Sequence, residues 1–188
     1  MRKVLRFCLR YFKGQNKMKY NTTEEALERL LTYFKVYYNI TRYEADKLPL
    51  TALCEFYEHS QKYVLSRKAE LWSEDSEEFV YLFQVPHLTL DLFQKMKEYA
   101  YEDGMKRLHI GPGHMCSVIN PIILCNTCDK DVIREIKKCR IYKSFHFSLH
   151  GWMDFRVAAV ILNEDRIERN ASGHSTAKIL KKVLYSKK

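Results

Sequence analysis

The sequence predicts an α+β fold: a single domain with a mixed, mostly antiparallel sheet and helices packed mainly on one face. Some segments repeat apolar residues at helical spacing, and others alternate apolar and polar residues with the period of two that a strand requires. Helices fall between only some of the strands, and this mixed order indicates an α+β protein. We expect the strands to form a meander followed by a C-terminal hairpin.

Composition and charge fit one ordinary globular domain. With 188 residues and 46% apolar residues, the chain can build a core without disulfides or structural metal. Its net charge of +9 is uneven, because residues 1–17 carry +6 and leave only +3 for the rest. The overall basicity is therefore a weak argument for nucleic-acid binding.

Residues 1–17 have the pattern of a basic amphipathic helix. The segment is predicted to be a dispensable tail ahead of a domain at residues 18–188, with Met18 as an alternative start. Two other interpretations stay open, namely contact with an anionic membrane surface and docking of a partner.

The six cysteines are scattered within apolar stretches, and the N-terminus lacks the apolar core of a secretory signal. This usage fits reduced thiols, so we expect a cytoplasmic protein. No run approaches the roughly 18 apolar residues of a membrane span, so the body of the chain is expected to be soluble.

The first half predicts one helix and three strands. Thr22 and Glu25 form a capping box, and apolar residues then repeat at helical spacing to about Asn39. After a break at residues 48–50, extended runs follow at residues 52–58, 63–72 and 79–85. The acidic residues 73–78 are expected to form the turn between the last two runs.

The second half alternates helices and strands. A helix is expected from Pro86 or Thr89 to Gly104, the latter as the residue after the helix. Residues 115–125 read as a strand covered on both faces, with Pro121 at an edge or bulge. A short helix from Asp129 or Asp131 to about Cys139, a turn at residues 163–165, a strand at 166–169 and a helix at 176–185 capped by Ser172 complete the chain.

Residues 145–162 form the predicted central hairpin. Their odd positions are nearly all apolar, which is the pattern of a half-buried strand. A three-residue loop at His150-Gly151-Trp152 would pair Leu149 with Met153 and Phe147 with Phe155. That register keeps one face wholly apolar.

The other face of this hairpin is the predicted site. It carries polar residues that, with Trp152 and with His109 and His114 from a Gly-Pro-Gly loop, could line a pocket. The catalytic candidates are His146, Ser148, His150, Asp154 and Arg156. A solvent-facing polar surface explains the same residues.

A metal or redox centre is a weaker hypothesis. The candidate ligands are His109, His114, His146, Cys125 and Cys128, which are residue types that bind zinc but lack a local ligand spacing. Cys125-Asn-Thr-Cys128 precedes a predicted helix, whose dipole would lower a thiol pKa, yet the acids Asp129 and Asp131 that follow oppose this. Coincidental thiols remain the simpler interpretation, and no metal is expected.

The common catalytic signatures are missing. The chain has no Gly-rich dinucleotide or phosphate-binding motif, no Gly-x-Ser-x-Gly and no His-Glu-x-x-His. We therefore expect no cofactor. A basic stripe of Arg134, Lys137, Lys138, Arg140 and Lys143, joined by Lys178, Lys181 and Lys182, could contact phosphates, but a solvated helix face explains it equally well.

The span from about Tyr63 to the last helix resembles an uncharacterised bacterial domain family of unknown function. The resemblance is carried by Lys62-Tyr63, Leu71-Trp72, the His-Gly-Trp within residues 145–152, and residues 170–173. It implies no particular activity or cofactor.

We expect a non-enzymatic binding or accessory module that recognises a small ligand or a protein. One alternative is a hydrolase or nuclease-like enzyme that uses the His/Asp/Arg pocket on the hairpin. A second alternative is a nucleic-acid-binding protein.

Overall fold

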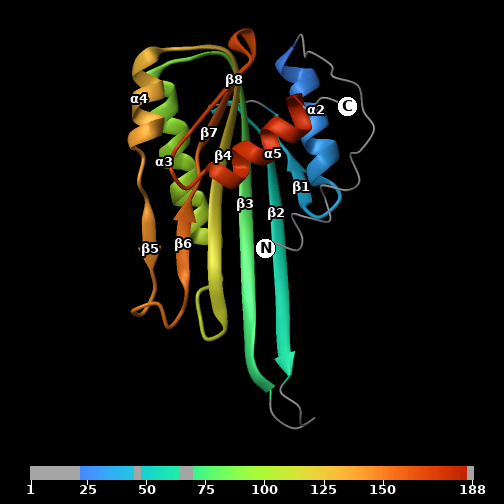
Figure 1. The fold of residues 1–188 in the computed structure, drawn as a ribbon, viewed down its shortest axis with the longest axis vertical. Helices are drawn as coiled ribbons and strands as arrows, with labels where there is room; N and C mark the ends of the chain where they lie inside the picture. The colour runs from blue at the N-terminus through green and yellow to red at the C-terminus, as the bar shows by residue number, and fades with distance from the viewer. Residues whose placement is uncertain (1–21, 45–47, 64–69, 186–188) are drawn as a thin grey trace.

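One mixed sheet forms the centre of the computed structural model, which describes residues 22–44, 48–63 and 70–185 (Figure 1). Eight strands of these residues belong to it. β3 pairs antiparallel with β2 and parallel with β4, and β1 pairs antiparallel with β2. Their bounds are β1 (Asn39–Arg42), β2 (Leu50–Tyr63), β3 (Glu70–Leu88) and β4 (His114–Cys128).

The remaining edge of β4 is shared between two short strands. β6 (Trp152–Phe155) pairs with the first part of β4 and β7 (Ala158–Ile161) with the second, both in parallel. β5 (Tyr142–Ser144) is antiparallel to β6, and β8 (Arg166–Arg169) is antiparallel to β7. The predicted α+β class and mixed sheet are confirmed, and β8 has the predicted bounds.

The helices cover both faces of the sheet, two on each. α3 (Leu90–Arg107) and α4 (Lys130–Lys138) pack on what we call the α3 face. α2 (Thr23–Phe34) and α5 (His174–Tyr185) pack on the opposite side, the α5 face (Figure 1). The prediction of helices mainly on one face is therefore wrong.

The reason lies in the apolar runs of β3 and β4. Phe79, Tyr81 and Phe83 point to the α3 face, while Val80 and Leu82 point to the α5 face, and all five are buried. Strands that are apolar on both sides need a layer on each side, as parallel strands generally do. None of the described helices is both long and apolar enough to cross a membrane.

The helix caps follow the sequence. The side chain of Thr22 accepts a hydrogen bond from the backbone of Glu25, and that of Thr89 does the same for Leu92. α3 continues past Gly104, where we expected it to end. The glycine lies within the helix because the space of its missing side chain is occupied by Ile119 of β4. α5 begins at His174 rather than at Thr176.

Two long strands replace the three short ones that we expected in residues 52–85. The acidic residues 73–78 lie within β3 and pair with β2, from Tyr57 opposite Glu77 to Gln61 opposite Ser73. Strand pairing uses backbone groups, so a charged stretch can extend a hairpin, here with the side chain of Glu77 buried. Residues 1–17, the predicted tail, lie outside the described residues.

Pro121 occupies the interior strand β4, not an edge or a classical bulge, and the prediction there is wrong. It lies between Ile119, the last residue paired with β6, and Ile122, the first paired with β7. The Ile119 carbonyl accepts a hydrogen bond from the Arg156 amide, so the backbone groups of residue 119 point toward the edge shared by β6 and β7. The backbone groups of residue 121, two positions further along β4, point to the same edge. The missing proline N–H therefore falls where β4 changes partner.

The central hairpin exists with a different pairing. Its strands are β5 and β6, with Ser144 opposite Trp152 and Tyr142 opposite Asp154, so residues 145–151 form the loop. The predicted pairs of Leu149 with Met153 and Phe147 with Phe155 are wrong. Residues 158–161, assigned to the same hairpin strand, form β7 after a break at Arg156 and Val157.

Gly104 allows a stability test of the contact between α3 and β4. A Cβ at this position would lie 2.7 Å from Cδ1 of Ile119. Overpacking of about 1–3 kcal/mol should outweigh the helix propensity of about 1 kcal/mol that alanine gains, so Gly104→Ala should lower the free energy of unfolding. Urea denaturation measures the change.

Gly111→Ala is the matched control, because a Cβ there meets nothing within 4 Å. Adding Ile119→Val, which removes Cδ1, should restore part of the loss. Equal stabilities for Gly104→Ala and Gly111→Ala would contradict this account of the packing.

Candidate functional site

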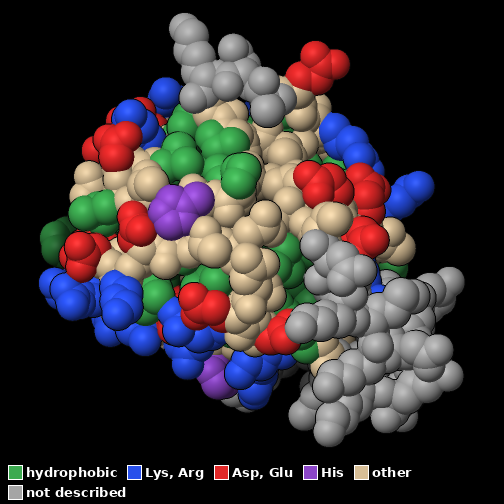
Figure 2. All heavy atoms as spheres, turned by 90° about the horizontal axis from the view of Figure 1, so that it is seen from above, with side chains coloured by type: hydrophobic (Ala, Val, Ile, Leu, Met, Phe, Trp, Pro, Cys, Tyr) green, Lys and Arg blue, Asp and Glu red, His purple; other side chains and the backbone are tan. Residues whose placement is uncertain are grey.

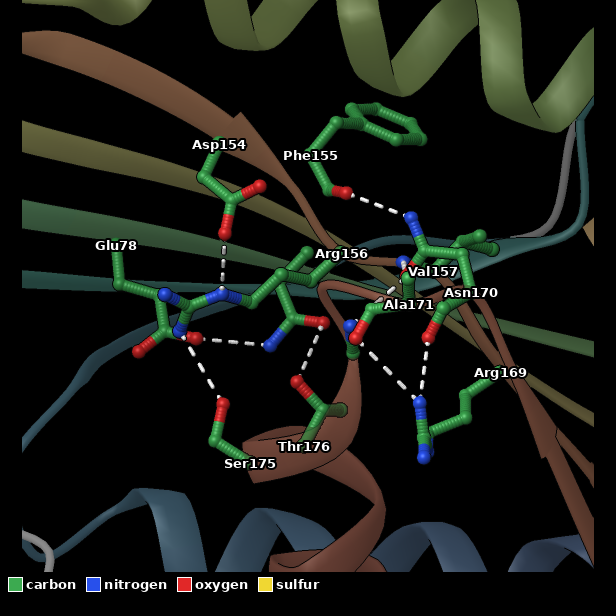
Figure 3. A network of polar contacts seen from close by, with 12 residues as sticks. Glu78, Asp154, Phe155, Arg156, Val157, Arg169, Asn170, Ala171, Ser175 and Thr176 are labelled. Atoms are coloured by element: carbon green, nitrogen blue, oxygen red, sulfur yellow. Dashed lines mark hydrogen bonds and ion pairs between the residues drawn. The ribbon is translucent and has the colours of Figure 1, made fainter. Parts of the chain in front are cut away.

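Asn170 bridges the break between β6 and β7 (Figure 3). Its Nδ2 donates to the Phe155 carbonyl at 2.8 Å, and its Oδ1 accepts from the Val157 amide at 3.2 Å and the Gly173 amide at 2.9 Å. Its own amide donates to the Val157 carbonyl at 3.1 Å. A buried side chain thus replaces the strand pairing that is interrupted there, and fixes the start of α5 as well.

Arg156 extends from this break onto the α5 face. Its Nε donates to Oδ2 of Asp154 at 3.0 Å, and a terminal nitrogen lies 3.4 Å from Oγ of Ser175 in the first turn of α5. The side chains of Arg156 and Asp154 are only 15% and 20% exposed. The structure therefore brings together two of the predicted catalytic candidates.

Glu78 lies near this pair and is held by two other partners. Its Oε1 accepts from Nδ2 of Asn120 at 2.8 Å and its Oε2 from the Tyr38 hydroxyl at 2.9 Å. Asn120 accepts in turn from the hydroxyl of Thr176 at 3.2 Å. Burial, with the adjacent Glu78 carboxylate, raises the pKa of Tyr38 well above its usual value.

We call this group of side chains the α5 polar cluster: Glu78, Asn120, Asp154, Arg156, Ser175 and Thr176. Val118 pairs with both Glu78 and Asp154, so the two acids lie two strands apart, with Cα atoms about 10 Å from each other. All six side chains have hydrogen-bond partners within the protein. Such mutual satisfaction is typical of a polar core that fixes neighbouring elements.

The two histidines of the predicted pocket lie at the α3 face instead. Nε2 of buried His114 lies 2.6 Å from Oγ of Ser117, which donates to Glu77 at 2.6 Å. Nδ1 of His114 donates to the His150 carbonyl, since a carbonyl can only accept. His109 caps Glu77 from outside, through Nδ1 at 2.9 Å and its backbone amide at 3.1 Å.

His146, Ser148 and His150 lie in the β5–β6 loop (residues 145–151), whose backbone meets the α3-face group at the bond from His114 to the His150 carbonyl. The imidazole rings of His146 and His150 stack with centroids 4.9 Å apart. The candidate residues are thus distributed over the α5 face, the α3 face and a loop. They do not meet in one cleft.

The β5–β6 loop has an unusual backbone. His146, Phe147 and Ser148 have φ angles of 49°, 52° and 66°, a left-handed conformation that non-glycine residues rarely adopt. The amides of Phe145, Leu149, His150 and Gly151 all donate to carbonyls within the loop. Phe147 is 94% exposed and Leu149 73% exposed, so an ordered loop presents two large apolar side chains to solvent.

Cys125 and Cys128 lie at the end of β4, before α4 begins at Lys130. A hydrogen bond between the two thiols raises the pKa of buried Cys125 and lowers that of Cys128. Neither thiol lies near His109, His114 or His146 in the chain's fold, and no three His, Cys, Asp or Glu side chains of the described residues gather in a way that could hold a metal ion.

Sequence reasoning missed Glu78, Asn120, Asn170, Ser175 and Thr176. Asn120 gave a usable signal, since a polar residue inside the apolar run of β4 must find a buried partner. Glu78 gave none, because it ended an acidic run that resembled a turn. The partners of Asn170 could not be inferred, as they depend on where the chain breaks between β6 and β7.

These features define an α+β protein whose single mixed sheet carries a polar cluster on one face and an exposed apolar loop at one end. The chain belongs to the family described as Domain of unknown function (DUF8052), which matches residues 22–182. This confirms the resemblance to a domain family of unknown function; a bacterial origin stays a prediction. No curated protein and no solved structure matches the chain.

Removing the bridge at Asn170 should destabilise the fold. Asn170→Ala removes the side-chain partner of the Val157 amide and of the Phe155 carbonyl, while the Gly173 amide keeps its bond to the backbone carbonyl of residue 170. At about 1–3 kcal/mol for each of these two buried groups left unsatisfied, we expect a total loss of roughly 2 kcal/mol or more. Asn163→Ala, at an exposed position, is the control; a loss for Asn170→Ala no larger than that of the control would refute the bridging role.

Ionisation of Tyr38 should lower the free energy of unfolding at alkaline pH. The tyrosine pKa is about 10 in an unfolded chain and higher in this fold, so its stabilising contribution is complete below pH 10 and is lost as the pH rises further. The stability difference between the wild type and Tyr38→Phe should therefore shrink, or reverse, above that pH. Tyr142→Phe, at a position that is 63% exposed, is the control in chemical denaturation; parallel curves for wild type and Tyr38→Phe would contradict the prediction.

Proposed function

We propose that the protein is a non-enzymatic binding module whose contact element is the β5–β6 loop. One observation supports this proposal above all: Phe147 and Leu149 are 94% and 73% exposed on a loop whose backbone is ordered by its own hydrogen bonds. Exposed apolar side chains that are held in place commonly mark an interaction site.

The backbone of the loop supports the same proposal. Three consecutive left-handed residues, His146 to Ser148, cost free energy of about 1–3 kcal/mol each. The conformation turns Phe147 outward although His146 and Phe145 beside it make contacts within the protein. Strain that exposes an apolar side chain has no stabilising purpose in the isolated domain, so a role in contact is the simplest explanation.

A hydrolase or nuclease-like enzyme is the second candidate, because Asp154 and Arg156 do lie side by side near Glu78. These charges are paired with each other and largely buried, however, and a catalytic group needs access to substrate. His146, Ser148 and His150 would have to act from a different part of the molecule. The geometry favours binding over catalysis.

A nucleic-acid-binding role is supported least. The basic residues of α4 and those of α5 belong to opposite faces of the sheet, so they do not extend one another. Arg134, Lys137 and Lys138 are paired with Asp131, Glu168 and Glu135. Figure 2, a view of the end opposite to the β5–β6 loop, shows acidic side chains among the basic ones along the rim.

Site-specific photocrosslinking tests the proposed function. Replacing Phe147 with the photoreactive residue p-benzoylphenylalanine should give a crosslinked partner, protein or lipid, in cells that express the chain. The same replacement at Val36, which is 47% exposed on the segment after α2, should not give that adduct. Excess unmodified protein should compete for the adduct, whereas the double variant Phe147→Ser/Leu149→Ser should not. Adducts that are identical at both positions, or absent at both, would refute the proposal.

A further inference from the structure

We infer that the β5–β6 loop docks onto an anionic lipid surface, with Phe147 and Leu149 entering the boundary between headgroups and acyl chains. The inference rests on the proposed function and names its partner. The two side chains are among the most exposed large apolar groups of the described residues, and they follow each other within three positions of one loop. Phenylalanine and leucine are typical of the apolar side of segments that lie in a membrane interface.

The charges of the chain segment that carries the loop complement an anionic surface. Arg140 and Lys143 flank it and are basic, His146 and His150 lie within it, and residues 140–153 contain no acid. The first acid after the loop, Asp154, is paired with Arg156. Each basic side chain near a membrane with anionic lipids strengthens binding by about 1 kcal/mol.

The neighbouring loop extends the same surface. Residues 108–113 precede β4 and lie beside the β5–β6 loop at one end of the sheet (Figure 1). A Cβ on Gly151 would lie 2.3 Å from the carbonyl oxygen of Met115, so the β5–β6 loop directly contacts the start of β4, just after residues 108–113. Ile110 is 43% exposed and Met115 39% exposed, and residues 104–128 contain no acid. Exposed apolar side chains therefore continue beyond the tip, as far as the strand pairing of β4 with the acidic residues 75–78 of β3.

The loop is preorganised for insertion by hydrogen bonds within the protein. The Phe145 amide donates to the Gly151 carbonyl, the His150 amide to the Phe145 carbonyl, and His114 to the His150 carbonyl. Phe145 itself is buried in the core of the α3 face and anchors the base of the loop. An ordered loop loses little conformational entropy when it binds, which favours a contact made by few side chains.

The small size of the apolar tip favours a lipid surface over a protein groove. A protein interface of standard size buries about 800 Å² on each partner, which is more than two side chains provide. Interfacial attachment needs only a few apolar side chains when electrostatic attraction adds to them. Attachment of this kind should weaken as salt screens the charges.

Vesicle co-sedimentation of the full chain tests the inference. We expect binding to phosphatidylcholine vesicles containing about one third phosphatidylserine, at least about tenfold weaker binding without the anionic lipid, and a loss with added salt. Because residues 1–17 are basic, the decisive comparison is between loop variants of the same full chain. Phe147→Ser/Leu149→Ser should weaken binding by about tenfold or more, and Val36→Ser should leave it unchanged.

A second measurement reports the depth of the loop directly. Phe147→Trp places an indole at the tip, and lipids brominated in the acyl chain should quench its fluorescence relative to the wild-type background. Absence of both vesicle binding and quenching would overturn the inference, as would vesicle binding that the double serine variant does not reduce.

The outcomes separate this inference from the proposed function. A protein adduct from photocrosslinking at position 147, without vesicle binding, would support the proposed binding function and refute the lipid surface as its partner. If neither a crosslinked adduct nor vesicle binding is found, both the proposed binding function and the lipid inference are refuted.

Discussion

The hydrogen bonds of Asn170 hold together the part of the fold on which the other elements depend. β4 runs through the middle of the sheet, and its outer edge must be shared by β6 and β7, which point the same way but do not form one strand. Asn170 replaces the missing pairing at Phe155 and Val157 and, through Gly173, sets where α5 begins. Pro121 lies opposite this break, where a backbone donor is not needed. The side-chain amide, the proline and the helix start thus form one arrangement, and the α5 polar cluster is assembled around it.

Much of the fold could be predicted because its signals are local. The caps at Thr22 and Thr89, the short helix after Asp129 and the strand at residues 166–169 each depend on neighbours within a few positions. The hairpin register depended on distant residues, and it was predicted wrongly. A period of two ran through residues 145–162, yet the chain leaves the strand twice, at the left-handed residues 146–148 and at Arg156. None of these residue types favours a left-handed backbone strongly, so the pattern alone could not reveal the loop.

The candidate site was predicted only in part, for the same reason. Asp154 and Arg156 are two positions apart in an extended segment, so their contact follows from strand geometry. Glu78, Asn120 and Ser175 join them through pairings that span much of the chain, and no spacing in the sequence encodes these. His114 appeared to belong with the same pocket, but the register of β3 and β4 shifts by one residue between His114 and Cys116. This shift turns His114 to the α3 face, where it contacts Ser117, the donor to Glu77.

The division between β6 and β7 also affects how stability is distributed. β6 contributes four residues and β5 three to their edge of the sheet, and the break after Phe155 separates them from the strand that supports α5. An edge unit of this kind can open locally while the rest of the sheet stays folded, and its amide hydrogens would then exchange with solvent sooner than those of β7. The β5–β6 loop is therefore carried by a small edge unit, which is joined to the α5 side by the bond from Asn170 to the Phe155 carbonyl and by the contact of Arg156 with Ser175.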